Sequence, residues 1–167
     1  MPFTLDAAAA LGLSFRAVTD ADMPFLSALY ASTRADELSV TGWPEATKAL
    51  FVVQQFAAQH GDYARNYPGM ERRIVEQRGA AVGRVYVDLT GDACHLIDIA
   101  LMPTARGQGM GRAILTDLLA YAARVEKPVK LSVIADNPAR RLYERLGFVT
   151  TETGTLYNSM TWQPPKR

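Results

Sequence analysis

The sequence predicts an α/β fold with a mixed central sheet of six to seven strands and about four helices. An apolar run at residues 96–102 is followed by a glycine-rich turn, an amphipathic run at 112–125 and a further apolar run at 130–135. A strand, a helix and a strand in that order form a parallel pair joined by a crossover. Strand patterns separated by short turns flank this unit, so antiparallel strands are expected to complete the sheet.

The first elements are predicted from their boundaries. Residues 14–18 are expected to form a short strand. A helix is then predicted to begin at Asp20 or Asp22, because an acidic cap followed by Pro24 marks a helix start. This helix is expected to run to about residue 34.

The middle of the chain is expected to hold a helix, a loop and three strands. A helix is predicted at residues 45–59, with an apolar stripe that consists of Leu50, Val53, Phe56 and Ala57. Residues 60–69 contain Gly, Asn and Pro and are expected to form a loop. Strands at 71–77 and 81–89 form a predicted hairpin. The run at 93–102 is too apolar for an exposed strand, so it is expected in the middle of the sheet.

A short helix with both ends marked is predicted near the C-terminus. Asn137 is a good N-cap, Pro138 suits the first helical position, and Gly147 suits a left-handed stop. One apolar face is expected to consist of Ala139, Leu142, Tyr143 and Leu146. Strands at 148–152 and 156–162 are expected to close the sheet as an antiparallel pair.

Composition limits the class of protein. A chain of 167 residues, 49% of them hydrophobic, predicts one domain over residues 1–167 with a real core. A net charge of +1 does not suggest a nucleic-acid or anionic-membrane partner. Residues 1–13 lack Lys and Arg, and no apolar run approaches ~20 residues, so neither a signal peptide nor a membrane span is expected. A lone Cys94 excludes an internal disulfide and predicts a cytoplasmic protein, and two distant histidines predict no metal site.

The most informative segment is the turn Arg-Gly-Gln-Gly-Met-Gly at residues 106–111. Alternate glycines let the backbone turn sharply and approach a ligand, and the following helix directs its free N–H groups into the turn. A strand, a glycine turn and a helix N-terminus together form a phosphate cradle. The alternative is a tight connection without a ligand. The spacing does not fit the dinucleotide or nucleoside-triphosphate loops but fits Arg-x-x-Gly-x-Gly, from Arg106 through Gly109 to Gly111.

This pattern resembles the pyrophosphate motif of the GCN5-related N-acetyltransferases (GNATs). The segment at residues 137–148 resembles their second cofactor motif, Asn-x-x-Ala-x-x-Leu-Tyr-x-x-x-Gly-Phe, at every position. The resemblance implies the GNAT fold, acetyl-CoA as cosubstrate, and two parallel strands that diverge around the pantetheine arm. It also implies that acetyl-CoA is bound by Ile99, Ala100, Leu101, Arg106, Gly107, Gln108, Gly109, Met110, Gly111, Arg112, Asn137 and Tyr143.

Acetyl transfer to an amine requires a base, because an alkylamine with a pKa of ~10.4 is mostly protonated at neutral pH. Asp98 is the predicted base, since an acid within an apolar strand is costly without a purpose. The alternative is an Asp98 carboxylate paired with Arg84. Weaker candidates are Glu37, Glu71, Asp88 and His95. The resemblance assigns the general acid to Tyr143, and the alternative is a core tyrosine with a satisfied hydroxyl.

The acceptor site is the least determined part of the sequence. The resemblance implies that the first two helices and the last strands build it, and we hypothesise contacts from Arg34, Glu37 and Trp43. These residues could equally form ordinary helix surface. The predicted function is transfer of acetyl from acetyl-CoA to a primary amine of a small molecule or peptide. Alternatives are an acyl-CoA-binding sensor without catalysis and a protein N-acetyltransferase. The family also permits a homodimer through the last strands.

Overall fold

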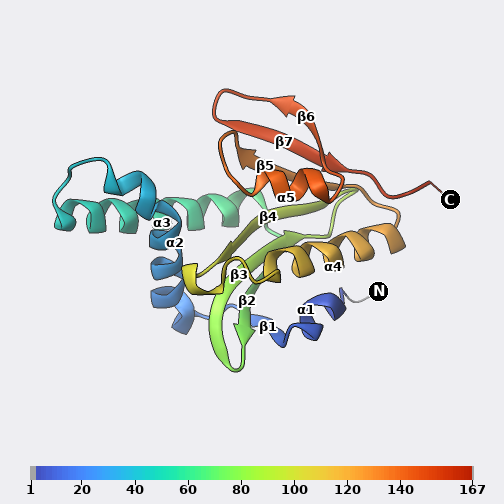
Figure 1. Cartoon of the computed structure of the whole chain (residues 1–167), viewed down its shortest axis with the longest axis horizontal. Coiled ribbons are helices and arrows are strands. Elements are labelled where there is room, and N and C mark those ends of the chain that lie inside the picture. The colour runs from blue at the N-terminus through green and yellow to red at the C-terminus, as the bar shows by residue number, and fades with distance from the viewer. Residues whose placement is uncertain (1–2, 167) are drawn as a thin grey trace.

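The computed structural model describes residues 3–166, and its central sheet confirms the predicted α/β class (Figure 1). Seven strands lie in the order β1-β2-β3-β4-β5-β7-β6. Neighbouring strands are antiparallel except for β4 and β5, which are parallel and place β4 in the middle as predicted. The strands are β1 (Leu13–Ala17), β2 (Glu71–Gln77), β3 (Ala80–Asp88), β4 (Cys94–Leu101), β5 (Val129–Ile134), β6 (Val149–Thr153) and β7 (Tyr157–Trp162).

Helices cover both faces of the sheet. They are α1 (Asp6–Ala10), α2 (Met23–Ser39), α3 (Glu45–Asn66), α4 (Met110–Arg124) and α5 (Arg140–Arg145), with short 3-10 turns η1 (Asp20–Asp22) and η2 (Pro103–Ala105). Adjacent residues of β2 show how the layers divide: Ile74 packs in a cluster with Leu26 and Phe56, whereas Val75 packs in a cluster with Ile114. Because successive strand residues point to opposite faces, α2 and α3 cover one face and α4 covers the other (Figure 1).

The predicted second helix is longer than expected, and its predicted apolar stripe is right only at Phe56 and wrong at Leu50, Val53 and Ala57. The helix α3 continues through most of the predicted loop and ends at Asn66. Its buried residues are Val52 and Phe56, while Leu50 and Val53 are exposed. Tertiary packing explains the extension, because the Tyr63 ring in the last turns packs edge-to-face on the core residue Tyr86. Such a contact outweighs the weak helix propensity of the Gly and Asn in this segment.

The helix α1 is an element that the sequence patterns did not predict. It has only five residues, too few to be stable alone. Its first turn is held by the carboxylate of Asp117 in α4, which accepts hydrogen bonds from the N–H groups of Ala7 and Ala8 at 2.8 and 2.9 Å. This cap comes from a residue more than 100 positions away, so no local signal could reveal it.

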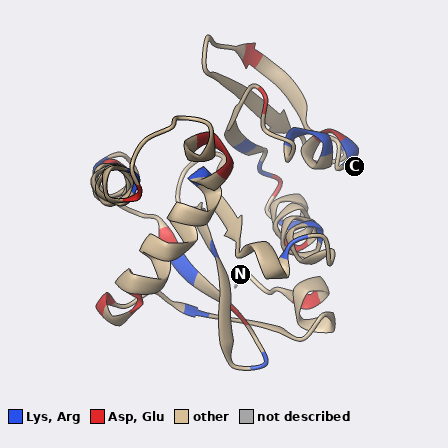
Figure 2. Cartoon of the chain, turned by 60° about the vertical axis from the view of Figure 1, so that its left-hand side comes forward, with Lys and Arg blue, Asp and Glu red and all other residues tan. Residues whose placement is uncertain are grey.

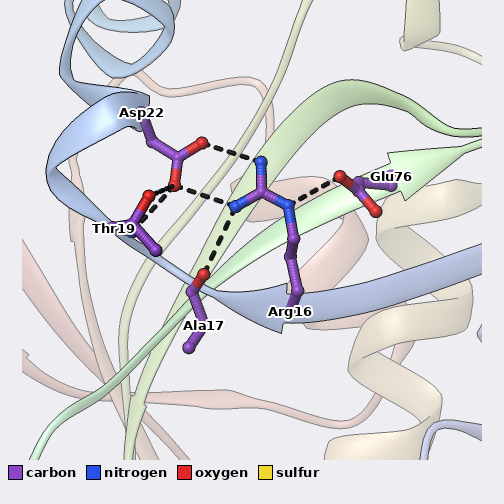
Figure 3. Close-up of polar contacts among 5 residues, drawn as sticks. All are labelled: Arg16, Ala17, Thr19, Asp22 and Glu76. Carbon is purple, nitrogen blue, oxygen red and sulfur yellow. Dashed lines mark hydrogen bonds and ion pairs between the residues drawn. The ribbon is translucent and has the colours of Figure 1, made fainter.

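An ion-pair network joins β1, η1 and β2 (Figure 3). Asp22 accepts two hydrogen bonds from the Arg16 guanidinium, at 2.9 and 2.7 Å, and one from the Thr19 N–H at 2.8 Å. The Arg16 Nε donates to Glu76 at 2.7 Å. Asp22 therefore lies at the predicted helix boundary, but its carboxylate caps η1 and anchors β1 instead of capping α2.

The short helix near the C-terminus is present as predicted but begins two residues later, at Arg140 with Ala139 as its N-cap, instead of at Pro138 with Asn137 as its N-cap. The Oδ1 of Asn137 accepts a hydrogen bond from the Ala139 N–H at 2.9 Å, so it caps the turn that leads into α5. Gly147 has a φ of +94°, as expected for a left-handed stop. Tyr143 is buried in the core cluster, and the other three residues of the predicted apolar face, Ala139, Leu142 and Leu146, are partly buried against the same cluster.

Candidate functional site

The parallel pair at the centre of the sheet separates toward its carboxyl end. Only residues 94–96 of β4 pair with β5. Beyond them β4 follows β3 to Leu101, whereas β5 follows β7 to Ile134. A bulge at residue 97 of β4 lies where the strands part, because Asp98 pairs with Tyr86 while Leu96 pairs with Val87. The facing edges of β4 and β5 therefore make no ladder with each other here, in the part of the chain that the structure describes.

The glycine turn follows β4 at this same end of the sheet. Gly107 and Gly109 have φ values of +73° and +80°, which favour glycine. The first bond of α4 runs from the Ala113 N–H to the Gly109 carbonyl, so the N–H groups of residues 110–112 have no partner within the helix. Among the described residues, no side chain caps this N-terminus. A Cβ at Gly107 or Gly109 would meet nothing within 4 Å, so the turn faces open space.

These features fit the diphosphate of coenzyme A. Uncapped amide groups and the positive end of the α4 dipole favour an anion at this place. The unpaired edge of β4 offers backbone groups to an extended arm in the way that an edge strand accepts another strand.

The side chain of Arg106 is already engaged by protein groups. Its Nε donates to the Leu101 carbonyl at 2.9 Å, and its Nη2 donates to the Ser32 Oγ at 3.3 Å. Arg106 thus connects the end of β4 to α2. The sequence pattern identifies Arg106 as part of the turn but contains no signal for its contact with Ser32, 74 positions away.

A buried charged cluster lies between β3, β4 and α3. The Arg84 guanidinium is 3% exposed and forms an ion pair with Asp98, whose side chain is 15% exposed. The same Nη2 of Arg84 donates to the Gln59 Oε1 at 2.9 Å. The structure therefore shows the Arg84–Asp98 pair that the sequence left as an alternative for Asp98. Burial raises the pKa of the Asp98 carboxyl, and the nearby Arg84 charge opposes this rise.

Tyr143 extends from α5 into the core near this cluster. Its ring packs edge-to-face on Phe148, with 5.8 Å between the centroids. Burial, followed by the negative charge of Asp98, raises the pKa of Tyr143 to about 12. The phenol is therefore protonated at neutral pH and can donate a proton.

A cavity of about 930 Å³ adjoins the separation of β4 and β5. Leu96 and Ile97 of β4 form part of its wall, at the point where the parallel pairing ends. Its lining is mostly polar and aromatic and is contributed by α2, α3 and the strands β4 to β7. Tyrosines from α2, α3 and β7 face it, namely Tyr30, Tyr63 and Tyr157.

The predicted acceptor residues occupy different places. Arg34 lines the cavity, whereas Glu37 and Trp43 are not among its lining residues. Both Arg34 and Glu37 lie within α2, where they form an ion pair at 3.2 Å. The Trp43 ring packs edge-to-face on Phe51 of α3 at 5.5 Å and remains 41% exposed.

Sequence reasoning named no specific residues from the last two strands for the acceptor site. Glu152 of β6 and Ser159 of β7 line the cavity, as do Thr151 and Thr161. Polar residues on one face of a strand are a signal for such a wall, but they match ordinary solvent exposure equally well.

The charged residues are spread over all layers of the fold (Figure 2). Within the described residues, no helix is long and apolar enough to cross a membrane. The same part of the chain contains no group of three or more His, Cys, Asp or Glu side chains suited to a metal ion.

The fold, the glycine turn and the divergent parallel strands define a class of acyl-CoA-binding domain. The chain belongs to the GNAT acetyltransferase family, because residues 45–166 match the model of the acetyltransferase (GNAT) domain. This membership confirms the resemblance seen in the two sequence motifs.

Known proteins support the same family. The chain is 45% identical over 108 residues to a mycothiol acetyltransferase from Streptomyces scabiei. The matched segment covers 64% of this chain and 30% of that protein. The chain thus spans under a third of that relative.

Solved structures share the fold at low identity. The PaiA N-acetyltransferase of Thermoplasma acidophilum, in complex with coenzyme A, has a TM-score of 0.69 and 12% identity, over 90% of this chain and 98% of that chain. The spermidine N-acetyltransferase of Vibrio cholerae, in complex with CoA and spermine, has a TM-score of 0.62 and 20% identity, over 92% and 96%.

Proposed function

We propose that this protein transfers an acetyl group from acetyl-CoA to the primary amine of a small molecule. One observation carries the proposal: the cavity is lined by Leu96 and Ile97 at the point where β4 leaves β5. A ligand held along the free edge of β4 would therefore end beside a second, separate binding space. Two substrates that meet at one point are what group transfer requires.

The acetyl-CoA side of the site rests on backbone groups. We propose that residues 107–112 hold the diphosphate through their amide groups, with charge from Arg106 and Arg112. The edge formed by residues 99–101 would pair with the pantetheine arm. Asn137, which caps the turn into α5, would contact the arm from the β5 side.

Acetyl-CoA supplies the acetyl group as an activated thioester. We propose Asp98 as the final acceptor of the amine proton and Tyr143 as the donor of a proton to the leaving sulfur. The raised pKa of Asp98 supports its role, because a weaker acid is a stronger base. The pKa of Tyr143, about 12, keeps the phenol protonated at neutral pH and so leaves a proton to donate, although it also makes the phenol a weaker acid than an ordinary thiol, whose pKa is ~8.5.

The acceptor is proposed to be a small polar amine, and Arg34 is proposed to contact it. The cavity volume of about 930 Å³ and its polar lining suit such a molecule. Two similar proteins are also named after small molecules: one is a mycothiol acetyltransferase and the other a spermidine N-acetyltransferase. Glu37 would orient Arg34 through the ion pair between them.

A thiol-release assay with acetyl-CoA tests the proposal directly. Small amines, amino acids and peptides serve as acceptors, and calorimetric titration with coenzyme A measures binding separately. Release with one or more small amines is the expected result. Binding without release from any acceptor would favour the sensor alternative, and release from peptides alone would favour a protein acetyltransferase. Absence of coenzyme A binding would overturn the whole proposal.

A further inference from the structure

The base proposed above does not itself line the acceptor cavity. Two residues of α3, Gln59 and Tyr63, do line the cavity. Gln59 accepts a hydrogen bond from Arg84, the ion-pair partner of Asp98. An amine bound in the cavity would therefore face Tyr63 and Gln59 before it faces the carboxylate.

Tyr63 is held in position for a connecting role. Its ring packs edge-to-face on Tyr86, with 6.3 Å between the centroids and an angle of 82°. Tyr86 pairs with Asp98 across the β3–β4 ladder, so the two aromatic rings and the carboxylate lie on neighbouring elements. Tyr63 lies one turn after Gln59 in α3, so both side chains face the Arg84–Asp98 pair to which Gln59 is bonded. Burial raises the pKa of the Asp98 carboxyl, and the Tyr63 hydroxyl makes the smallest of the opposing contributions. Tyr63 thus reaches both the cavity and the buried base.

We propose that Tyr63 is a catalytic residue that passes the proton of the acceptor amine to Asp98. This inference rests on the proposed acetyltransferase function. As the amine nitrogen forms its bond to the acetyl carbon, its N–H bond breaks and the proton goes to the Tyr63 hydroxyl oxygen. The proton of that hydroxyl moves to an Asp98 carboxylate oxygen, so Tyr63 begins and ends the step as a neutral phenol.

The surroundings of Tyr63 support a relay over direct base action. Burial raises the pKa of Tyr63, and the Asp98 charge raises it further, so a phenolate is strongly disfavoured. The phenol can accept a proton only while it gives one away, and the Asp98 carboxylate is the group that can take it. The charged and titratable groups that act on Tyr63 are Asp98, Arg84, Tyr157 and Tyr67. Those that interact with Asp98 are Arg84, Tyr63, Tyr86 and Tyr143.

The variant Tyr63→Phe keeps the ring on Tyr86 and removes only the relay oxygen. With the best amine from the acceptor panel, we expect kcat to fall on the order of 100-fold, the usual scale for a positioned proton transfer. Wild-type kcat should fall at low pH as Asp98 becomes protonated, at a pH above the ordinary Asp pKa of ~3.9. In Tyr63→Phe, kcat should no longer fall at low pH, because the proton of the amine can no longer pass to the Asp98 carboxylate. The KM for acetyl-CoA should stay unchanged.

A double variant separates a relay from two independent effects. If the proton passes through both groups in series, the double variant Asp98→Asn with Tyr63→Phe should have a kcat no lower than that of the more impaired single variant. Tyr121→Phe is the control, because it removes a hydroxyl from a buried tyrosine of α4 that does not line the cavity. Its kcat and the pH dependence of kcat should equal those of the wild type. Coenzyme A binding by each variant shows that it is folded.

Two results would overturn the relay while the proposed function stands. One is an unchanged acidic limb and turnover in Tyr63→Phe. The other is additive losses in the double variant. If wild-type protein releases no thiol with any amine, the proposed function fails first and the relay fails with it.

Discussion

Tyr143 is the residue whose assigned chemistry is easiest to test. Tyr143→Phe keeps the ring that packs on Phe148 and removes the proton donor. We expect kcat to fall on the order of 10²–10⁴-fold, because the leaving thiolate loses its positioned acid. The dissociation constant of coenzyme A should change little. Steady-state thiol release and calorimetry measure the two quantities, and unchanged turnover would reject the assignment.

Gly109 tests the backbone geometry of the proposed diphosphate site. At a φ of +80°, a side chain costs about 1–2 kcal/mol even though a Cβ would meet nothing within 4 Å. Gly109→Ala should therefore weaken coenzyme A binding and lower stability. Gly61→Ala in α3 is the control, since its φ is not positive and alanine favours a helix. Equal effects of both variants on coenzyme A affinity would contradict the prediction.

For single residues, the sequence identifies an unusual side chain more readily than the residue that it contacts. The position of Asp98 in an apolar strand reveals an unusual carboxylate, but whether it pairs with Arg84 depends on the register between β3 and β4. The contact of Arg106 with Ser32 depends on how α2 lies against the sheet. Both are tertiary facts that no local pattern encodes.

At the level of elements, the junction between β1 and η1 gives a pH-dependent prediction (Figure 3). Hydrogen bonds from Arg16 and Thr19 hold the pKa of Asp22 well below its usual range. A depressed pKa contributes stability that is present above the ordinary value of ~3.9 and is lost as pH falls below it toward the folded-state value. Asp22→Asn should therefore destabilise the fold by about 1–2 kcal/mol at pH 7.

The destabilisation by Asp22→Asn should shrink as the pH falls below ~4, because Asp22 of the unfolded wild-type chain then binds a proton that the folded state does not. Urea unfolding at pH 7 and pH 3 measures the difference in the free energy of unfolding between the wild type and Asp22→Asn. Arg16 keeps its bond to Glu76 in the variant, so the change isolates the Asp22 contribution. A gap of constant size at both pH values would show that charge is not the cause.

Elements with strong local marks are predictable from this sequence, and elements shaped by packing are not. The apolar runs of the parallel pair and the glycine that ends the C-terminal helix agree with the structure, although that helix begins two residues after Pro138. The end of α3 and the existence of α1 depend on Tyr86 and Asp117, which lie far away in the chain. The wrong stripe on α3 has the same origin, because an exposed Leu50 looks like a core residue in sequence.

The whole molecule should respond to coenzyme A as a stabilising ligand. At a ligand concentration of about 100 times Kd, binding adds about 2.7 kcal/mol to the free energy of unfolding. Because 1 kcal/mol shifts Tm by about 2–4 °C in a chain of this size, we expect a rise of roughly 5–10 °C. Gly109→Ala should show a smaller rise at the same concentration. A melting temperature that does not respond to coenzyme A would contradict the site.

The sequence also predicted the class of the whole fold, because the glycine turn between two apolar runs indicates a parallel pair joined by a helix. It could not define the acceptor cavity, whose walls come from α2, α3 and four strands. A space built from many elements depends on their packing angles, and no single segment records it.

Cys94 is the sole cysteine of the sequence, and its side chain is fully buried in the core. Burial also raises the pKa of its sulfhydryl, which keeps it out of the reactive ionised form. A colorimetric thiol reagent should therefore not react with the native protein, so in a thiol-release assay its colour would report only the free coenzyme A that is released. Once denaturant is added, the same chromophore reports global opening of the chain.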